Sequence, residues 1–84
     1  MKISVITATL NSISNIKKLY LSLKEQTDKN FEWIVADGES TDRTIEFLKS
    51  INDLNIILSI KKDNGIYDAM NRAIKISKNK YYVV

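Results

Sequence analysis

The chain has 84 residues, of which 44% are hydrophobic and 27% charged, so its composition is that of one small globular domain or part of a larger one. It has no cysteine and no histidine, which excludes disulfides, a thiolate or imidazole zinc site and a histidine general base within these residues. Its net charge is +3, without a basic run longer than two residues or an apolar run near the roughly 20 residues of a membrane span. We therefore expect no nucleic-acid partner and no membrane-spanning helix.

The first half of the chain alternates between two strand patterns and two helix patterns. Residues 2–8 are a short β-branched run typical of a buried strand, and residues 31–36 are a second strand that ends at an Asp-Gly turn. Between them, capping residue types precede a helix that ends near Gln26 and has apolar side chains at i, i+3, i+4 and i+7: Ile16, Leu19, Tyr20 and Leu23. A second helix is expected after the turn, with its cap supplied by Ser40, Thr41 and Asp42.

The second half repeats this alternation. Residues 54–60 predict a third strand, and a turn at residues 63–65 follows it. The clearest helical pattern of the chain runs from Ile66 to Ser77, and residues 80–84 begin a fourth strand. Strands that alternate with helices form parallel sheets, and their crossover connections are right-handed. We therefore predict an α/β fold of topology βαβαβαβ with a parallel sheet in the order 3-2-1-4.

The last predicted strand has neither a turn nor a helix after it. An uncovered apolar edge strand favours aggregation. We therefore interpret residues 1–84 as a single partial domain, the N-terminal part of a longer protein. A natural 84-residue protein that ends on an edge strand is the alternative.

Ligands of open α/β sheets bind at the carboxyl ends of the strands. Three segments are expected there: residues 7–12, 37–42 and 63–68. They contain both glycines and five of the ten acidic residues of the chain, and no Lys or Arg. Such a rim suits a ligand rich in hydroxyl groups, or a divalent metal that carries a phosphate. The loops at the opposite rim are not expected to bind.

Helix capping alone can explain several polar residues of this rim, but it does not explain Asp37, which still belongs to the end of a strand. We expect its carboxylate to face the ligand and to contribute little to the core. The usual phosphate signatures are absent, since neither G-x-G-x-x-G nor G-x-x-x-x-G-K-[ST] occurs. A nicotinamide-dinucleotide site and a P-loop are thus disfavoured. The end of the first strand, Thr7-Ala8-Thr9, also disfavours a receiver domain.

Three segments of the chain form a recognisable set: SVITATLN (4–11), FEWIVADGESTDRT (31–44) and DNGIYDAMN (63–71), with Gln26-Thr27 between the first two. Together they resemble the start of a family 2 glycosyltransferase, in its bacterial surface-polysaccharide branch. The resemblance covers nearly the whole chain, and the segments have the order and spacing of the family. It implies a fold of the GT-A type, of which this chain would be the nucleotide-binding half.

The resemblance implies an enzyme that transfers a sugar from a nucleotide-diphosphate sugar to a glycan or lipid-linked acceptor in envelope polysaccharide synthesis. Mg²⁺ or Mn²⁺ would assist the intact enzyme. The family pattern assigns seven residues to the donor side of the sheet: Thr7, Ala8, Thr9, Asn11, Asp37, Asp68 and Asn71. Among these, Asp37 would accept a hydrogen bond from the base or the ribose. A cytoplasmic location is implied, with peripheral association of the full protein at the inner face of the membrane.

The chain also departs from the family pattern. Leu10 lies where an aromatic residue is usual, and Glu39 and Arg43 replace glycines. The D-x-D metal motif is expected beyond Val84 and the catalytic base further on, so we assign no catalytic residue and no metal ligand within the chain. By itself it is expected not to transfer sugar. Two alternatives stay open: a truncated nucleotide-binding module without turnover, and an interaction fragment that pairs through its fourth strand.

Overall fold

The structure is a computed structural model that describes residues 3–62, 64–77 and 80–84. Its strands are β1 (Ile3–Thr9), β2 (Phe31–Asp37), β3 (Ile56–Ile60) and β4 (Lys80–Val83). Its helices are α1 (Ile13–Lys24), α2 (Thr44–Ser50) and α3 (Ile66–Ile76). The strands form one parallel sheet in the order β3-β2-β1-β4. The predicted fold class, element order and strand order are confirmed.

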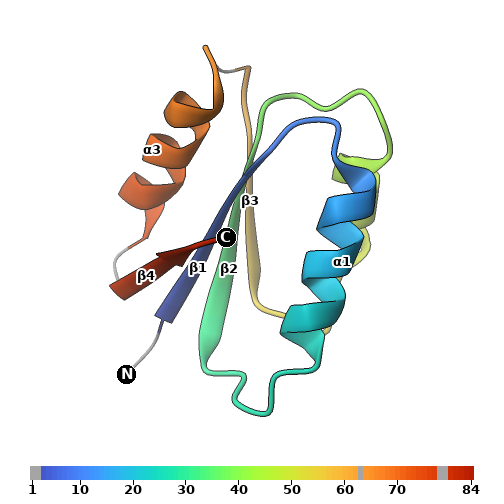
Figure 1. The fold of residues 1–84 in the computed structure, drawn as a ribbon, viewed down its shortest axis with the longest axis vertical. Helices are drawn as coiled ribbons and strands as arrows, with labels where there is room; N and C mark the ends of the chain where they lie inside the picture. The colour runs from blue at the N-terminus through green and yellow to red at the C-terminus, as the bar shows by residue number, and fades with distance from the viewer. Residues whose placement is uncertain (1–2, 63, 78–79) are drawn as a thin grey trace.

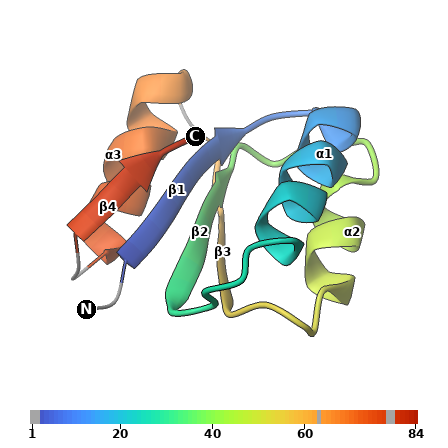
Figure 2. The ribbon, with the colours of Figure 1, turned by 60° about the horizontal axis from the view of Figure 1, so that its bottom comes forward.

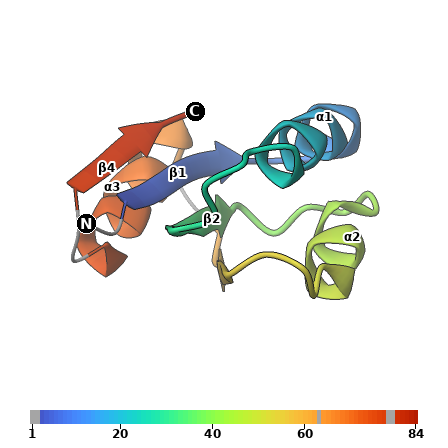
Figure 3. The same ribbon diagram turned by 90° about the horizontal axis from the view of Figure 1, so that it is seen from below.

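The helices cover both faces of the sheet. Helices α1 and α2 lie on one face and α3 lies on the other (Figures 1 and 2). The connections through α1 and α2 step from β1 to β2 to β3, whereas the connection through α3 returns across the sheet to β4. Because all such crossovers are right-handed, reversing the direction moves the third helix to the opposite face. The reversal creates a switch point between β1 and β4, next to α3 (Figure 3).

The larger half of the core lies between the sheet and helices α1 and α2. Its buried side chains are Val5, Ile16, Leu23, Phe31, Trp33, Val35 and Leu48. All seven residues of β2 are buried, as expected for a central strand with helices on both faces. The indole N–H of Trp33 donates to Thr7 Oγ1 at 3.0 Å, so the one polar atom of this large side chain is satisfied within the core.

Small side chains characterise the other half of the core, beneath α3. Ala69 and Ala73 of the helix pack against Ile6, Ile34 and Ala36 of the sheet. Alanine at both positions lets the helix backbone approach the strands closely, while Ile74 and Ile76 of the same helix pack, partly buried, against this cluster.

The element boundaries differ from the prediction by one or two residues. The first strand continues to Thr9, and α1 ends at Lys24 rather than near Gln26. The third strand begins at Ile56 rather than at residue 54, although Asn55 O still accepts the N–H of Trp33 at 2.8 Å. Residue 2 of the first predicted strand and residues 63, 78 and 79 of the predicted loops lie outside the described part of the chain.

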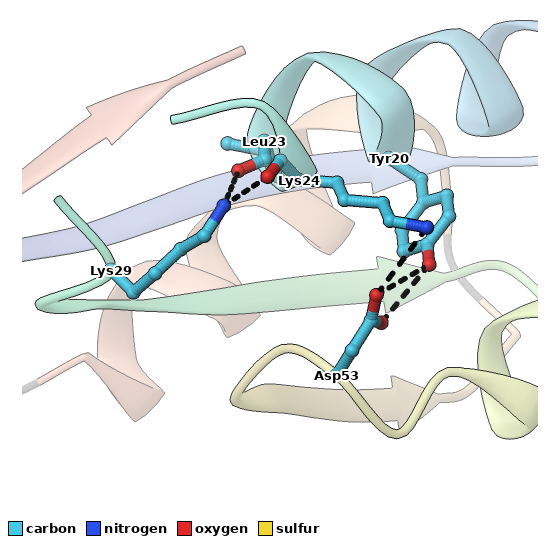
Figure 4. Close-up of polar contacts among 5 residues, drawn as sticks. All are labelled: Tyr20, Leu23, Lys24, Lys29 and Asp53. Atoms are coloured by element: carbon cyan, nitrogen blue, oxygen red, sulfur yellow. Dashed lines mark hydrogen bonds and ion pairs between the residues drawn. The ribbon is translucent and has the colours of Figure 1, made fainter. Parts of the chain in front are cut away.

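The rim at the amino ends of the strands is held by structural contacts (Figure 4). The hydroxyl of Tyr20 donates to the carboxylate of Asp53 at 2.9 and 3.0 Å, and Lys24 lies 3.8 Å from the same group. The hydrogen bond to Asp53 raises the pKa of Tyr20. Lys29 Nζ donates to the carbonyls of Leu23 and Lys24, which satisfies the C-terminal end of α1. These contacts join α1 to the connections that precede β2 and β3.

Candidate functional site

A cleft of about 260 Å³ opens at the carboxyl ends of β1 and β2, against the first turn of α3. Its lining is mostly apolar and includes both glycines of the chain: Ala8, Thr9, Leu10, Ser12, Gly38, Gly65, Ile66 and Ala69. The cleft lies at the carboxyl rim of the parallel strands, the rim at which open α/β folds bind ligands. It also lies on the glycine-containing rim that the sequence singles out.

Gly65 forms the entry to α3 on one side of this cleft. Its φ is +115° and its ψ is 175°, a backbone conformation that is essentially restricted to glycine. No heavy atom lies within 4 Å of where a Cβ would be. The glycine is therefore required by the backbone conformation rather than by a lack of space.

Two of the residues predicted at the end of β1 line the cleft, and one does not. Ala8 and Thr9 are lining residues, and Thr9 is only 8% exposed. Within the described residues, no partner is found for its buried Oγ1. Thr7 is buried in the core, where its hydroxyl accepts the Trp33 indole N–H.

Asn11 connects the two loops that follow β1 and β2, and it is not a lining residue. Its φ of +48° turns the chain after β1. Its side-chain Oδ1 accepts the backbone N–H of Thr41 at 2.7 Å and that of Asp42 at 3.2 Å. Its own N–H donates to Ser40 Oγ at 2.8 Å. Asn11 therefore holds the loops after β1 and β2 together beside the cleft.

Asp37 is fully buried, with an exposed fraction of 0%. Its Oδ2 accepts the backbone N–H of Ser40 at 2.7 Å, and its Oδ1 accepts the Ser40 hydroxyl at 2.6 Å. The expectation that this carboxylate contributes little to the core is wrong. Both of its oxygens close the turn after β2, because a buried carboxylate needs donors in place of water.

Of the three residues expected to cap α2, Ser40 and Thr41 do not cap it, whereas Asp42 does. The helix begins at Thr44, and Arg43 is its N-cap without a side-chain capping bond. Asp42 supplies the cap instead, because its Oδ1 accepts the N–H of Thr44 at 2.9 Å and its Oδ2 accepts that of Ile13 at 3.3 Å. Hydrogen bonding from Thr44 lowers the pKa of Asp42, while partial desolvation opposes the shift. One carboxylate thus serves the first turns of both α1 and α2.

The structure separates Asp68 and Asn71 from the residues that line the cleft. Both line a polar groove of about 490 Å³ between α3 and the chain that follows β3, together with Lys61, Lys62, Asn64, Arg72 and Lys75. Asp68 Oδ2 accepts the N–H of Asn64 at 3.1 Å, which closes the turn before the helix. The seven residues predicted on the donor side of the sheet are therefore divided among the cleft, its supports and this groove.

Arg72 is a residue of this rim that the sequence reasoning missed. Its Nε donates to Ser59 Oγ at 2.9 Å, and its Nη2 donates to the carbonyls of Asp37 and Ser59, both at 3.1 Å. In the sequence it resembles an ordinary cation on the polar side of a helix. No spacing signal could have indicated that it reaches backbone oxygens of two strands.

The described residues do not form a site for the divalent metal that the family resemblance implies. They contain no group of three or more His, Cys, Asp or Glu side chains that could hold an ion. The carboxylate at the end of β2, Asp37, is already bonded to Ser40. Within the same residues, no helix is long and apolar enough to cross a membrane.

Comparison with known proteins identifies the family. Residues 4–84 match the family Glycosyl transferase family 2, and the chain belongs to it. It is 38% identical over 81 residues to the Escherichia coli UDP-Glc:alpha-D-GlcNAc-diphosphoundecaprenol beta-1,3-glucosyltransferase WfaP, covering 94% of this chain and 32% of that protein. It is 33% identical over 78 residues to a PGL/p-HBAD biosynthesis glycosyltransferase of Mycobacterium tuberculosis, covering 88% of this chain and 30% of that protein.

Solved structures of the GT-A type share the fold. S. aureus TarS in complex with UDP-GlcNAc matches with a TM-score of 0.86 and 32% identity, over 100% of this chain and 26% of that chain. The mannosyltransferase PcManGT from Pyrobaculum calidifontis, in complex with GDP-Man and Mn²⁺, matches with a TM-score of 0.77 and 25% identity, over 90% of this chain and 24% of that chain. The chain spans about a third or less of the length of these proteins.

Proposed function

We propose that the chain forms the donor-binding part of a glycosyltransferase that moves a sugar from a nucleotide-diphosphate sugar to a glycan or lipid-linked acceptor in envelope polysaccharide synthesis. The observation that carries the proposal is the cleft at the carboxyl ends of β1 and β2, bounded by Gly38 and Gly65, in a chain of this family. Nucleotide sugars in the complexes of TarS and PcManGT support the class of donor. We place the protein in the cytoplasm, with peripheral association at the membrane.

The dimensions and lining of the cleft favour the nucleoside end of such a donor. Ligand pockets for whole drug-sized molecules have volumes of roughly 300–1,000 Å³, so a cleft of about 260 Å³ suits the base and part of the ribose. Leu10 and Ile66 offer apolar surface to the base, and the hydroxyls of Thr9 and Ser12 offer hydrogen bonds. The diphosphate and the sugar would then extend beyond these residues.

The residues of this chain bind and orient the donor, and we assign none of them to the transfer itself. Group transfer also needs a group that stabilises the departing diphosphate and one that deprotonates the acceptor hydroxyl. The 84 residues contain no D-x-D. We therefore propose that the chain by itself does not transfer sugar. In the whole enzyme, its binding of the nucleotide would lower the entropic cost of bringing the donor into position for the reaction.

Titration of the labelled chain with UDP-GlcNAc or GDP-mannose tests the binding site. Amide shifts are expected at residues 8–12, at Gly38 and at residues 65–69, with none at residues 24–30. Leu10→Glu adds a carboxylate beside the cleft and should weaken binding at least about tenfold by repelling the phosphates. Leu21→Glu is the matched control, because Leu21 is equally exposed (53% against 56%) but lies on α1 away from the cleft. Equal affinities of the two variants would reject the site.

The exposed edge strand supports a second candidate function, pairing with another chain. Strand β4 lies at the edge of the sheet, and its apolar side chains Tyr81, Tyr82 and Val83 are exposed. Sedimentation of the chain over a range of concentrations distinguishes this candidate. Self-association that Tyr82→Lys abolishes, in a chain that binds neither nucleotide sugar, would favour it.

A further inference from the structure

We propose that Arg72 is a positioning residue that sets the separation of the two walls of the cleft. One wall is carried by the end of β2, through Gly38, and the other by the start of α3, through Ile66 and Ala69. The inference rests on the proposed function in one respect, because it assumes that the separation of the walls determines the affinity for a nucleotide. The effect of Arg72 on the position of the walls can be measured without any ligand.

The contacts of Arg72 join α3 to two strands of the sheet, β2 and β3. Arg72 belongs to α3, Ser59 to β3 and Asp37 to β2. The Asp37 carbonyl accepts two donors, Arg72 Nη2 at 3.1 Å and Lys61 N at 2.9 Å. A guanidinium has its donors in a rigid planar fork, so bonds from Nε and Nη2 fix the orientation of the side chain as well as its distance.

The position of the contact links it directly to both walls. Asp37 immediately precedes Gly38, whose N–H donates to Thr9 O at 3.0 Å and so fixes that wall to β1. Ala69 is three residues before Arg72 and therefore lies one helical turn away. A shift of the helix relative to the Asp37 carbonyl would change the opening between Gly38 and Ala69.

The packing beneath α3 is supplemented by a directional polar contact. Ala69 and Ala73 pack against Ile6, Ile34 and Ala36, and the partly buried Ile74 and Ile76 of the helix pack against the same cluster. Such apolar contacts hold the helix close to the sheet but have no directional preference. The bonds of Arg72 add donors of fixed direction, which resist a shift of the helix along the sheet.

Arg72→Met and Arg72→Lys test the proposal against Lys75→Met as the matched control. Methionine keeps an unbranched side chain without donors, and lysine keeps the charge without the fork. Lys75 lies on the same helix and lines the same groove, so its variant controls for loss of a cation there. The measurements are the affinities for UDP-GlcNAc and GDP-mannose and, without ligand, the amide shifts of Gly38, Ile66 and Ala69.

Arg72→Met is expected to weaken nucleotide-sugar binding about tenfold and to move the three ligand-free amide resonances. Arg72→Lys should have a smaller effect on both, and Lys75→Met should leave both unchanged. Affinity equal to wild type in both Arg72 variants would overturn the proposal, as would unchanged amide resonances. If wild type binds neither nucleotide sugar, the proposed function fails, while displaced resonances in Arg72→Lys still support a positioning role. If Arg72→Met does not fold, Arg72→Lys alone decides.

Discussion

Asn11 and Ser40 join the two loops that follow β1 and β2: the N–H of Asn11 donates to Ser40 Oγ at 2.8 Å, across 29 residues of sequence. The same hydroxyl donates to Asp37 Oδ1 at 2.6 Å. The two hydrogen bonds of the Ser40 hydroxyl therefore connect the buried end of β2 to the turn after β1. The serine in the Ser40-Thr41-Asp42 sequence acts as a connector between loops rather than as a helix cap.

Ser40→Ala should destabilise the fold by about 1–3 kcal/mol, because it removes one donor from a buried carboxylate and one acceptor from the N–H of Asn11. Urea unfolding followed by far-UV circular dichroism measures the change. Ser50→Ala is the matched control, since the Ser50 hydroxyl donates only to the exposed end of its own helix, at Phe47 O. That variant should remain within about 0.5 kcal/mol of wild type. Similar effects for the two variants would contradict this role of Ser40.

Asp37→Asn should cost about 2–3 kcal/mol, since an amide oxygen can replace only one of the two carboxylate acceptors that Ser40 uses. The amide would also place an N–H₂ group opposite the Ser40 donors. Thermal unfolding is the measurement, with Glu46→Gln on the exposed side of α2 as the control. A melting temperature equal to that of the control would restore the idea that the carboxylate is available to a ligand.

The fold could be predicted from the sequence because its signals are local. Apolar periodicity and Asp-Gly or Asn-Gly turns define the alternation of strands and helices, and the handedness of crossovers then leaves few topologies. The location of the rim followed from Gly38 and Gly65. The roles of individual polar residues could not be predicted, since Asp37, Asn11 and Arg72 have partners that only the tertiary fold brings together.

Asp68 and Asn71 illustrate the same limit. The family resemblance assigned them to the donor side, and the helical pattern alone could not say which side of α3 would border the cleft. In the structure, Ala69 borders the cleft while Asp68 and Asn71 line the polar groove. A difference of one position on a helix rotates a side chain by about 100°, so a motif match does not determine which opening a side chain reaches.

Glu39 has a φ of +65°, a left-handed conformation at a position where the family pattern has glycine. Glu39→Val should destabilise the fold by about 1–2 kcal/mol, because a β-branched residue is strained there, whereas Glu39→Gly should be within about 1 kcal/mol of wild type. The same two changes at Glu46, within α2, provide the control. There the order should reverse, with Gly worse than Val, since a helical conformation disfavours glycine. The same order at both positions would show that backbone conformation is not the cause.

The pH dependence of stability should reveal the double cap made by Asp42. Its pKa is lowered in the folded state from the ordinary value of 3.8, so the unfolded chain binds the proton more tightly. The contribution of the Asp42 carboxylate to folding stability is therefore fully present above about pH 4 and is lost as the pH falls through the folded-state pKa.

Asn cannot titrate, so the stability difference between wild type and Asp42→Asn should be constant from about pH 7 to 5 and shrink below about pH 4. Urea unfolding at each pH measures this difference. Ser50→Ala, which removes no titrating group, provides the control series. A difference that stays constant down to about pH 3 would mean that the carboxylate does not hold the first turns of α1 and α2 through charge.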